Sequence, residues 1–124
     1  MPTTTYLDNK LLAASLGNVA YSAVPYAALY SVSPTAAGGG TELSGSGYSR
    51  QSISMTVSAG SATSNAAVVF GNATADWSTA VAWAICDASS GGNVLYYAPF
   101  NPTQTVKSGK NLTVATGDIT ITIV

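Results

Sequence analysis

The sequence predicts one domain, residues 1–124, folded as an antiparallel β-sandwich with one short N-terminal helix. Three observations favour this fold class. Short runs of apolar and β-branched residues recur along most of the chain, residues typical of turns separate them, and no helix-length segment lies between them as a parallel sheet would need. A second sheet about 10 Å away then buries the apolar face of each strand. A jelly-roll order of strands is compatible with this pattern, which leaves the strand order open.

A helix is predicted over residues 5–16, because apolar side chains recur there at helical spacing. Its stripe consists of Leu7, Leu11, Leu12 and Leu16. Thr4 or Thr5 can cap the N-terminus, Asp8 lies in the first turn, and Gly17 follows the end. The stripe is expected either to cover a face or edge of the sheet or to dock on a neighbouring subunit.

About eight strands are predicted after the helix. They are Tyr26–Val32, Tyr48–Val57, Ala66–Phe70, Ala80–Cys86, Val94–Ala98, Gln104–Val106, Asn111–Val114 and Asp118–Val124. Turn residues between Asp87 and Asn93 predict that residues 80–98 form a hairpin. Regular alternation in the last strand places three side chains toward the core, those of Ile119, Ile121 and Ile123.

The strand at residues 80–86 is predicted to be central and buried on both faces. Its larger side chains alternate with small ones: Val81, Trp83 and Ile85 against Ala82, Ala84 and Cys86. Trp83 is therefore expected in the core. Cys86, the single cysteine, is expected to be a buried thiol in a protein that folds in a reducing compartment.

Residues 33–47 interrupt the strand pattern with prolines, serines and a cluster of glycines. This composition predicts an exposed arm without regular structure, because Pro and Gly disfavour both helices and strands. We expect the arm to act as a contact loop.

The composition argues against an enzyme. The chain has four basic and five acidic residues and no histidine, so the groups that usually transfer protons or activate nucleophiles are scarce. The basic residues are scattered, which argues against nucleic acid as a partner. No apolar window approaches the roughly 20 residues that span a bilayer, and the N-terminus carries no export signal, so no membrane is expected.

Three kinds of ligand chemistry were weighed. Two carboxylates can hydrolyse a glycoside, but no spacing favours a pair among Glu42, Asp76, Asp87 and Asp118. The turn at residues 87–93 offers too few oxygen ligands for calcium, and the glycines lack the strand and helix of a phosphate-binding loop. Neither a metal nor a cofactor is expected.

Several segments along the chain, taken together and in order, resemble a family of small tailed-bacteriophage virion proteins often labelled tail-fibre-like. The similar segments are Asn9–Leu12, Leu29–Tyr30, Pro34–Thr35, Gly38–Ser44, Gly47–Gln51, Ala73–Trp77, Asp87–Ala88, Gly91–Asn93 and Gly117–Asp118. The resemblance implies a non-enzymatic virion component. It is either a decoration (cement) protein on the capsid or a small fibre or tip module on the tail.

The sequence favours the cement protein, because it contains no heptads, triple-helical repeats or long β-repeats that would build a fibre shaft. The expected location is then the capsid surface of a virion assembled in the host bacterial cytoplasm. The expected partners are the major capsid protein and copies of the chain itself, as a trimer. In the alternative, the partners are other tail proteins or a host surface glycan.

Low charge and abundant aromatic residues favour a protein that works by packing against other subunits. The predicted contact residues between subunits are Glu42, Tyr48, Arg50, Trp77, Tyr97 and Phe100. Arg50 either lies in solvent or forms an ion pair between subunits with a carboxylate such as Glu42. Exposed rings in the second half of the chain are alternatively candidates for stacking on sugars, namely Trp77, Tyr96, Tyr97 and Phe100.

Overall fold

The computed structural model describes residues 3–18, 20–22 and 24–122. Within these ranges it has one helix and ten strands. The elements are α1 (Thr5–Ser15), β1 (Tyr26–Val32), β2 (Thr41–Glu42), β3 (Gln51–Ser52), β4 (Met55–Ser58), β5 (Ser61–Ser64), β6 (Val68–Phe70), β7 (Ala80–Cys86), β8 (Val94–Gln104), β9 (Leu112–Val114) and β10 (Thr120–Thr122). The predicted all-β fold with an N-terminal helix is confirmed.

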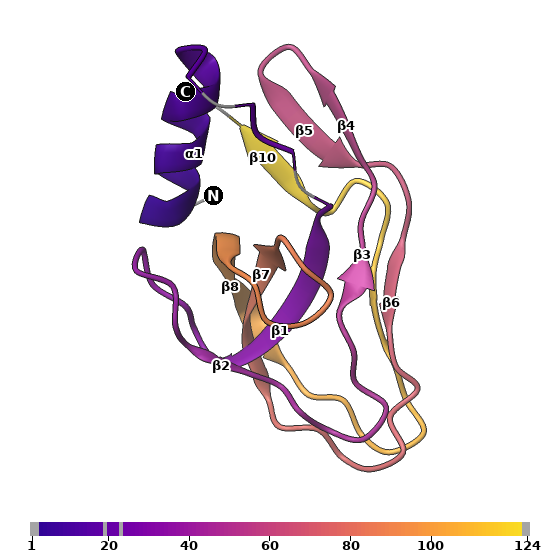
Figure 1. The fold of residues 1–124 in the computed structure, drawn as a ribbon. Helices are drawn as coiled ribbons and strands as arrows, with labels where there is room; N and C mark the ends of the chain where they lie inside the picture. Colours follow the sequence, from indigo (N-terminus) through magenta and orange to yellow (C-terminus); the bar gives the residue numbers. More distant parts are fainter. Residues whose placement is uncertain (1–2, 19, 23, 123–124) are drawn as a thin grey trace.

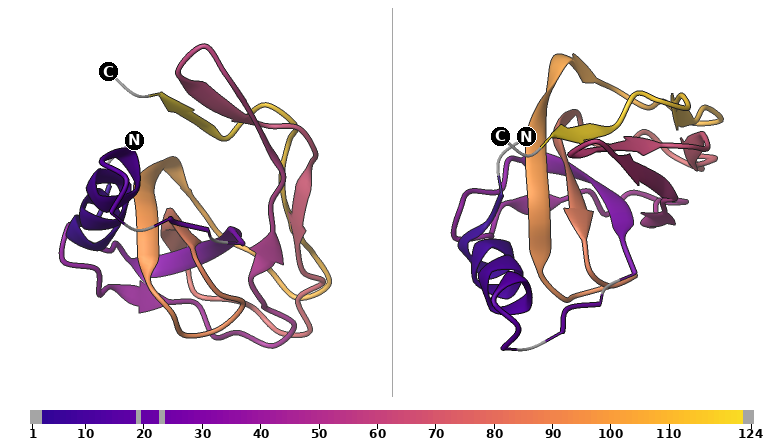
Figure 2. Two further views of the ribbon diagram at one scale, coloured as in Figure 1. Left: turned by 45° about the horizontal axis from the view of Figure 1, so that its top comes forward. Right: turned by 90° about the horizontal axis from the view of Figure 1, so that it is seen from above.

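The strands form a sandwich-like arrangement of antiparallel sheets (Figure 1). The large sheet has the order β2-β1-β7-β8, and β3 also pairs with β1. Two smaller sheets, β10-β5-β4 and β6-β9, face one side of it, whereas α1 lies on the other side (Figure 2). The described helix therefore does not belong to the layer that closes the main core.

Two apolar clusters occupy the two faces of the large sheet. The first lies between the layers and includes Ala27, Leu29 and Ile85 of the large sheet, Val68 and Phe70 of β6, and Ile119 just before β10. The second lies on the opposite face and consists of Ala28, Tyr30, Ala82, Ala84 and Cys86. Trp83 and Ile121 pack against the first cluster, as predicted for the core, and Ile123 lies outside the described residues.

The predicted alternation of β7 holds in most of the strand. Ile85 and Trp83 belong to the first face, and Ala82, Ala84 and Cys86 to the second. Val81 was expected beside Trp83, but it packs against the second cluster. The cause is a register irregularity between Ala80 and Ala82 in the pairing with β8, which breaks the period of two.

The start of α1 is fastened to β8 through Thr4, which is almost completely buried. Its hydroxyl donates to the Val94 carbonyl at 2.6 Å and accepts from the Leu7 amide at 3.3 Å, as an N-cap. Of the four leucines expected either to cover the sheet or to dock on a neighbouring subunit, only Leu7 is buried within the chain. The rest of the predicted stripe is exposed, because the helix contacts the sheet mainly through its first turn.

Two of the predicted strands are divided differently in the structure. Residues 48–57 form two short strands in separate sheets, β3 and β4, instead of one. The run predicted over Val94–Ala98 extends through Pro99 and Pro102 to Gln104 as the single strand β8, whereas Thr105 and Val106, predicted to be in a strand with Gln104, lie outside it. Prolines are tolerated in this strand because β8 is the last strand in its sheet. A backbone N–H that is missing on its outer side removes no hydrogen bond to a neighbouring strand.

The expectation of an irregular arm over residues 33–47 is wrong at its centre. Thr41 and Glu42 form β2, which pairs with β1, and Leu43 beyond it is buried. Gly38, Gly39 and Gly40 all have positive φ, so the chain reverses there and returns alongside β1. The Thr5 amide also donates to the Ala36 carbonyl at 2.8 Å, which ties this segment to the helix.

Candidate functional site

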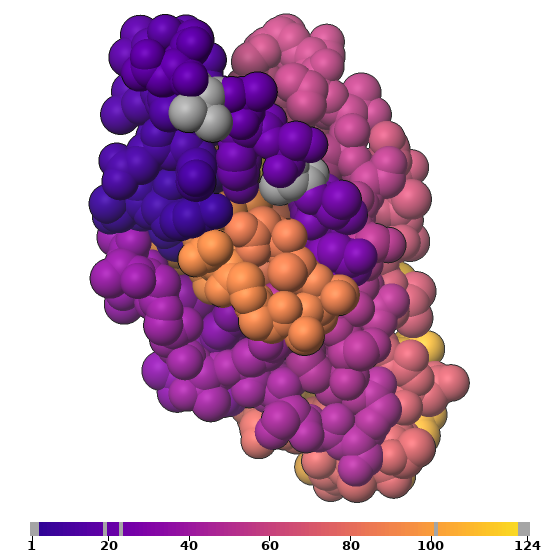
Figure 3. Space-filling view, in the orientation of Figure 1, coloured from indigo at the N-terminus to yellow at the C-terminus, as the bar shows by residue number. Residues whose placement is uncertain are grey.

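Glu42 and Arg50 form an ion pair within one chain. Arg50 Nε donates to Glu42 Oε2, and Nη2 donates to Oε1, both at 2.9 Å. Its Nη1 donates to the carbonyls of Ala88 and Gly91, each at 2.8 Å. The hydrogen bonds to Glu42 raise the pKa of the guanidinium, against the opposing effect of burial. Arg50 thus fastens the β7–β8 turn to the edge of the large sheet; Figure 3 shows this turn, in orange, at the centre of one face.

Tyr48 continues this network into the core. Its hydroxyl accepts from the Leu29 amide at 2.9 Å and donates to Glu42 Oε2 at 2.7 Å. The Leu29 amide lies between the residues that pair with β2 and those that pair with β3, so the hydroxyl takes the place of a missing strand partner. Burial raises the pKa of the phenol, which therefore stays protonated at neutral pH.

Trp77 is buried beside Tyr48. The two rings meet edge to face with centroids 5.5 Å apart, and Trp77 Nε1 donates to the Ser46 carbonyl at 2.8 Å. We name Glu42, Tyr48, Arg50 and Trp77 the inner cluster. Four of the six predicted contact residues thus meet inside the chain, and Trp77, at 4% exposure, leaves no open ring face for a partner. A role of Glu42, Tyr48 and Arg50 between subunits stays a prediction.

Tyr48→Phe is expected to lower the free energy of unfolding by about 2 kcal/mol, because the buried Leu29 amide loses its acceptor. Tyr30→Phe is the matched control: among the described residues, the Tyr30 hydroxyl has one long hydrogen bond, to Cys86 Sγ at 3.9 Å, so a loss of about 0.5 kcal/mol or less is expected. Urea denaturation of both variants measures the difference. Equal losses of unfolding free energy in the two variants would show that the Tyr48 hydroxyl contributes no more to stability than the Tyr30 hydroxyl.

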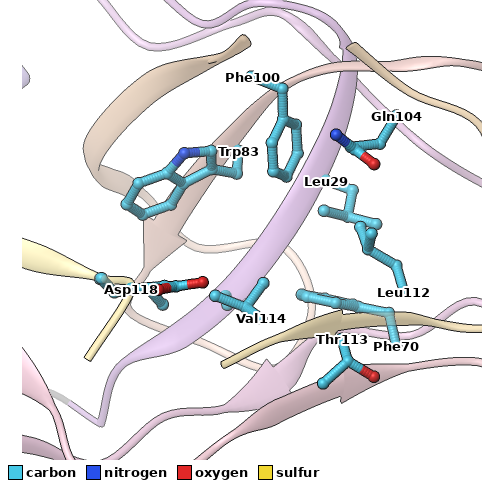
Figure 4. Close-up of a pocket in the computed structure, with 11 residues that line it drawn as sticks. Leu29, Phe70, Trp83, Phe100, Gln104, Leu112, Thr113, Val114 and Asp118 are labelled. Atoms are coloured by element: carbon cyan, nitrogen blue, oxygen red, sulfur yellow. The ribbon is translucent and has the colours of Figure 1, made fainter. Parts of the chain in front are cut away.

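A cleft of about 340 Å³ opens between the layers of the sandwich (Figure 4). Its buried floor is formed by Ala27, Leu29, Phe70 and Ile119. Trp83 and Phe100 form one wall and Leu112 and Val114 the other, while Gln104, Thr113 and Asp118 supply polar groups. We name this the interlayer cleft.

The other predicted aromatic contacts lie apart from each other. Phe100 lines the interlayer cleft, whereas Tyr97 packs against the second cluster, on the opposite face of the large sheet. Sequence reasoning did not assign Gln104 to a site, and it considered Asp118 only as one of four carboxylates whose spacing favoured no pair. Only the relative placement of β8 and the segment before β10 brings them to one cleft.

Three of the four carboxylates weighed for catalysis are engaged within the chain. Glu42 binds Arg50; Asp87 accepts from the Asn93 amide at 2.7 Å, and Asp76 from the Ser108 amide at 2.8 Å. The Ser108 amide, and to a lesser degree Lys107, lower the pKa of Asp76. Asp118 lies in the interlayer cleft. Across the part of the chain that the structure describes, no group of three or more metal-ligating side chains is found.

The exposed face of α1 carries a row of leucines. Leu11 is 38%, Leu12 59% and Leu16 73% exposed. We name these three the exposed leucine row. Neighbouring apolar side chains left in water on one helix are typical of surfaces that pack against another molecule. Judged over residues 3–18, 20–22 and 24–122, no helix is long and apolar enough to cross a membrane.

The fold, the scarcity of ionisable groups and the exposed leucine row define a small β-rich protein suited to packing against other proteins. Residues 2–122 match the family model described as Podophage GP4 fiber I protein gp80, and the chain belongs to this family. The resemblance to small tailed-phage virion proteins labelled as fibres is confirmed, and the chain is a phage virion structural protein. No curated protein matches the chain.

Proposed function

We propose that the protein is a non-enzymatic subunit of the tail-fibre apparatus, held to other tail proteins by the exposed leucine row. The observation that carries the tail location is the family match over residues 2–122, since that family is named for a fibre protein of a podophage. A sandwich-like fold that leaves the exposed leucine row open to solvent supports a role as a building block. This replaces the capsid as our preferred location.

The exposed leucine row can supply much of the attachment energy. Burying a leucine side chain gains about 1.5–3 kcal/mol, so three leucines offset a good part of the cost of association. The helix holding them is anchored by Thr4 and Leu7, which fixes the direction of the row relative to the sandwich. A fixed strip loses less conformational entropy on binding than a flexible one.

The cement function predicted from the sequence stays a second proposal. It is supported by the short elements: the helix has 11 residues and the longest described strand also has 11, which suits a compact block better than a shaft. In this case the chain, as a trimer, would bind the major capsid protein and stabilise the assembled shell.

Immunogold labelling of intact virions tests the location. Label confined to the tail supports the fibre proposal, whereas label spread over the head overturns it in favour of cement. Heating virions that lack the protein provides a second readout. An unchanged shell with reduced adsorption is expected for a fibre subunit, and a less heat-stable shell for a cement protein.

The double variant Leu12→Gln/Leu16→Gln is expected to keep the fold and lose incorporation into virions at least tenfold, because both side chains are exposed within the chain. Val57→Gln is the matched control, since Val57 is 77% exposed on β4. Protein per virion is measured by quantitative immunoblot, and folding by thermal denaturation. Normal incorporation of the double variant would exclude the exposed leucine row as the attachment surface.

A further inference from the structure

We propose that the interlayer cleft binds an uncharged sugar ring. The cleft combines a deep apolar floor with an aromatic wall and a few polar groups at the opening, which is the usual composition of small-ligand sites. Its volume of about 340 Å³ lies at the lower end of such sites, suited to about one or two rings. This inference goes beyond the proposed function and does not depend on where the protein sits in the virion.

The aromatic wall favours a sugar over a flat polar ligand. Trp83 on β7 and Phe100 on β8 come from neighbouring strands and border the same space (Figure 4). Both are only partly buried, so part of each ring is open to solvent. The negative face of an aromatic ring attracts the C–H groups on one side of a sugar ring. The two rings therefore provide a surface on which a pyranose can stack.

The polar groups suit hydroxyls. Figure 4 shows the Asp118 carboxylate pointing into the cleft from one end, with Gln104 near the other. Gln104 Nε2 donates to the Pro102 carbonyl at 3.0 Å, so its amide oxygen is left as an acceptor. Within the described ranges, no hydrogen bond or ion pair joins the Asp118 carboxylate to another group. A sugar presents hydroxyl donors to both ends.

Charge narrows the class of sugar. Asp118 is the one charged side chain that lines the cleft, so an acidic sugar would be repelled there. A purely apolar ligand would displace water from the Asp118 carboxylate and the Gln104 amide without offering either group a hydrogen-bond partner. Neutral hexoses and their N-acetylated or 6-deoxy forms fit both conditions.

The test uses the purified full chain and methyl glycosides of glucose, galactose, rhamnose and N-acetylglucosamine, with methyl glucuronoside as the anionic probe and hexanol as the apolar probe. The chain has two tryptophans, so Trp77→Phe, once thermal denaturation shows that it is folded, leaves Trp83 as the single tryptophan, whose emission is excited selectively over that of the tyrosines. We expect at least one neutral glycoside to shift the Trp83 emission saturably, and the glucuronoside to bind at least tenfold more weakly. Binding of hexanol alone would overturn the proposal. So would the absence of binding by every neutral glycoside up to about 50 mM, because a Kd above 1 mM already corresponds to a binding free energy weaker than about 4 kcal/mol.

Asp118→Ala tests the site itself, because Asp118 is exposed and its loss leaves the core intact. It is expected to weaken binding of the best glycoside about tenfold, since a hydrogen bond to a charged group is lost. Asp8→Ala, which removes an exposed carboxylate on α1, is the matched control and should bind normally. Trp83→Leu should abolish binding of the glycoside. Titration calorimetry measures the affinity of each variant. Unchanged affinity in both Asp118→Ala and Trp83→Leu would place the sugar elsewhere and contradict the proposal.

Discussion

Arg50→Ala is expected to lower the free energy of unfolding by about 3 kcal/mol, the largest effect of any charged residue in the chain. The side chain is 8% exposed and makes four hydrogen bonds, two to Glu42 and two to carbonyls of the β7–β8 turn. Its removal leaves the Glu42 carboxylate, only 26% exposed, without its cation. Urea denaturation followed by far-ultraviolet circular dichroism measures the loss.

Lys107→Ala is the control for charge alone. Lys107 and Asp76 are 3.5 Å apart, but their side chains are 68% and 57% exposed, so the expected loss is far smaller than that of Arg50→Ala. The double variant Arg50→Ala/Glu42→Gln should recover part of the Arg50→Ala loss, because the uncompensated charge is gone. A loss in Arg50→Ala no larger than in Lys107→Ala would mean that the turn holds its place without the guanidinium.

Trp77→Ala is expected to cost about 4 kcal/mol, because a large buried ring leaves a cavity that its neighbours cannot fill. The indole is packed closely: a Cβ built at Gly45 would clash with Trp77 Cδ1, and the Tyr48 and Trp77 rings lie edge to face. The Ser46 carbonyl would also lose one of its two donors and keep the Thr74 amide, at 3.1 Å. Thermal denaturation and chemical denaturation both report this change.

Trp83→Ala provides a control with the same change in side chain. Trp83 borders the interlayer cleft and is partly buried, so part of the space it leaves is already open to water, and a loss of about 2 kcal/mol is expected. Trp77→Phe should fall between these values, since it keeps a ring but removes the hydrogen bond. Equal losses for the two alanine variants would contradict the placement of Trp77 in the core and Trp83 at the cleft.

Elements with strong local patterns could be predicted from the sequence. β7 was identified from alternating large and small side chains, and α1 from its spacing and cap, because both signals depend on neighbours in the chain. β5 was missed, since Ser61–Ser64 is mostly polar and becomes a strand only by pairing with β4 and β10. β2 was missed because Pro and Gly around it signal a loop, whereas its partner β1 decides the outcome.

The candidate sites depend still more on distant contacts. An ion pair between Glu42 and Arg50 of different subunits was one of the predicted alternatives. The sequence did not indicate that this ion pair forms within a single chain. Nor could it indicate that Trp77 and Tyr48 meet, because the chain between them passes through another sheet. The interlayer cleft needs the placement of β1, β8 and β9 together, which no local pattern contains.

The central position of β1 sets the order in which the protein can fold during synthesis. The hairpins β4–β5 and β7–β8 join neighbouring segments and can close as soon as they leave the ribosome. By contrast, β1 pairs with β2 and β3 along one edge and with β7 along the other, where Tyr26 lies opposite Cys86 and Tyr30 opposite Ala82, so this second edge stays open until β7 has been translated. A nascent chain stalled before residue 80 therefore leaves the β7-facing edge of a largely buried strand open to the cell, which exposes this stage to aggregation and proteolysis.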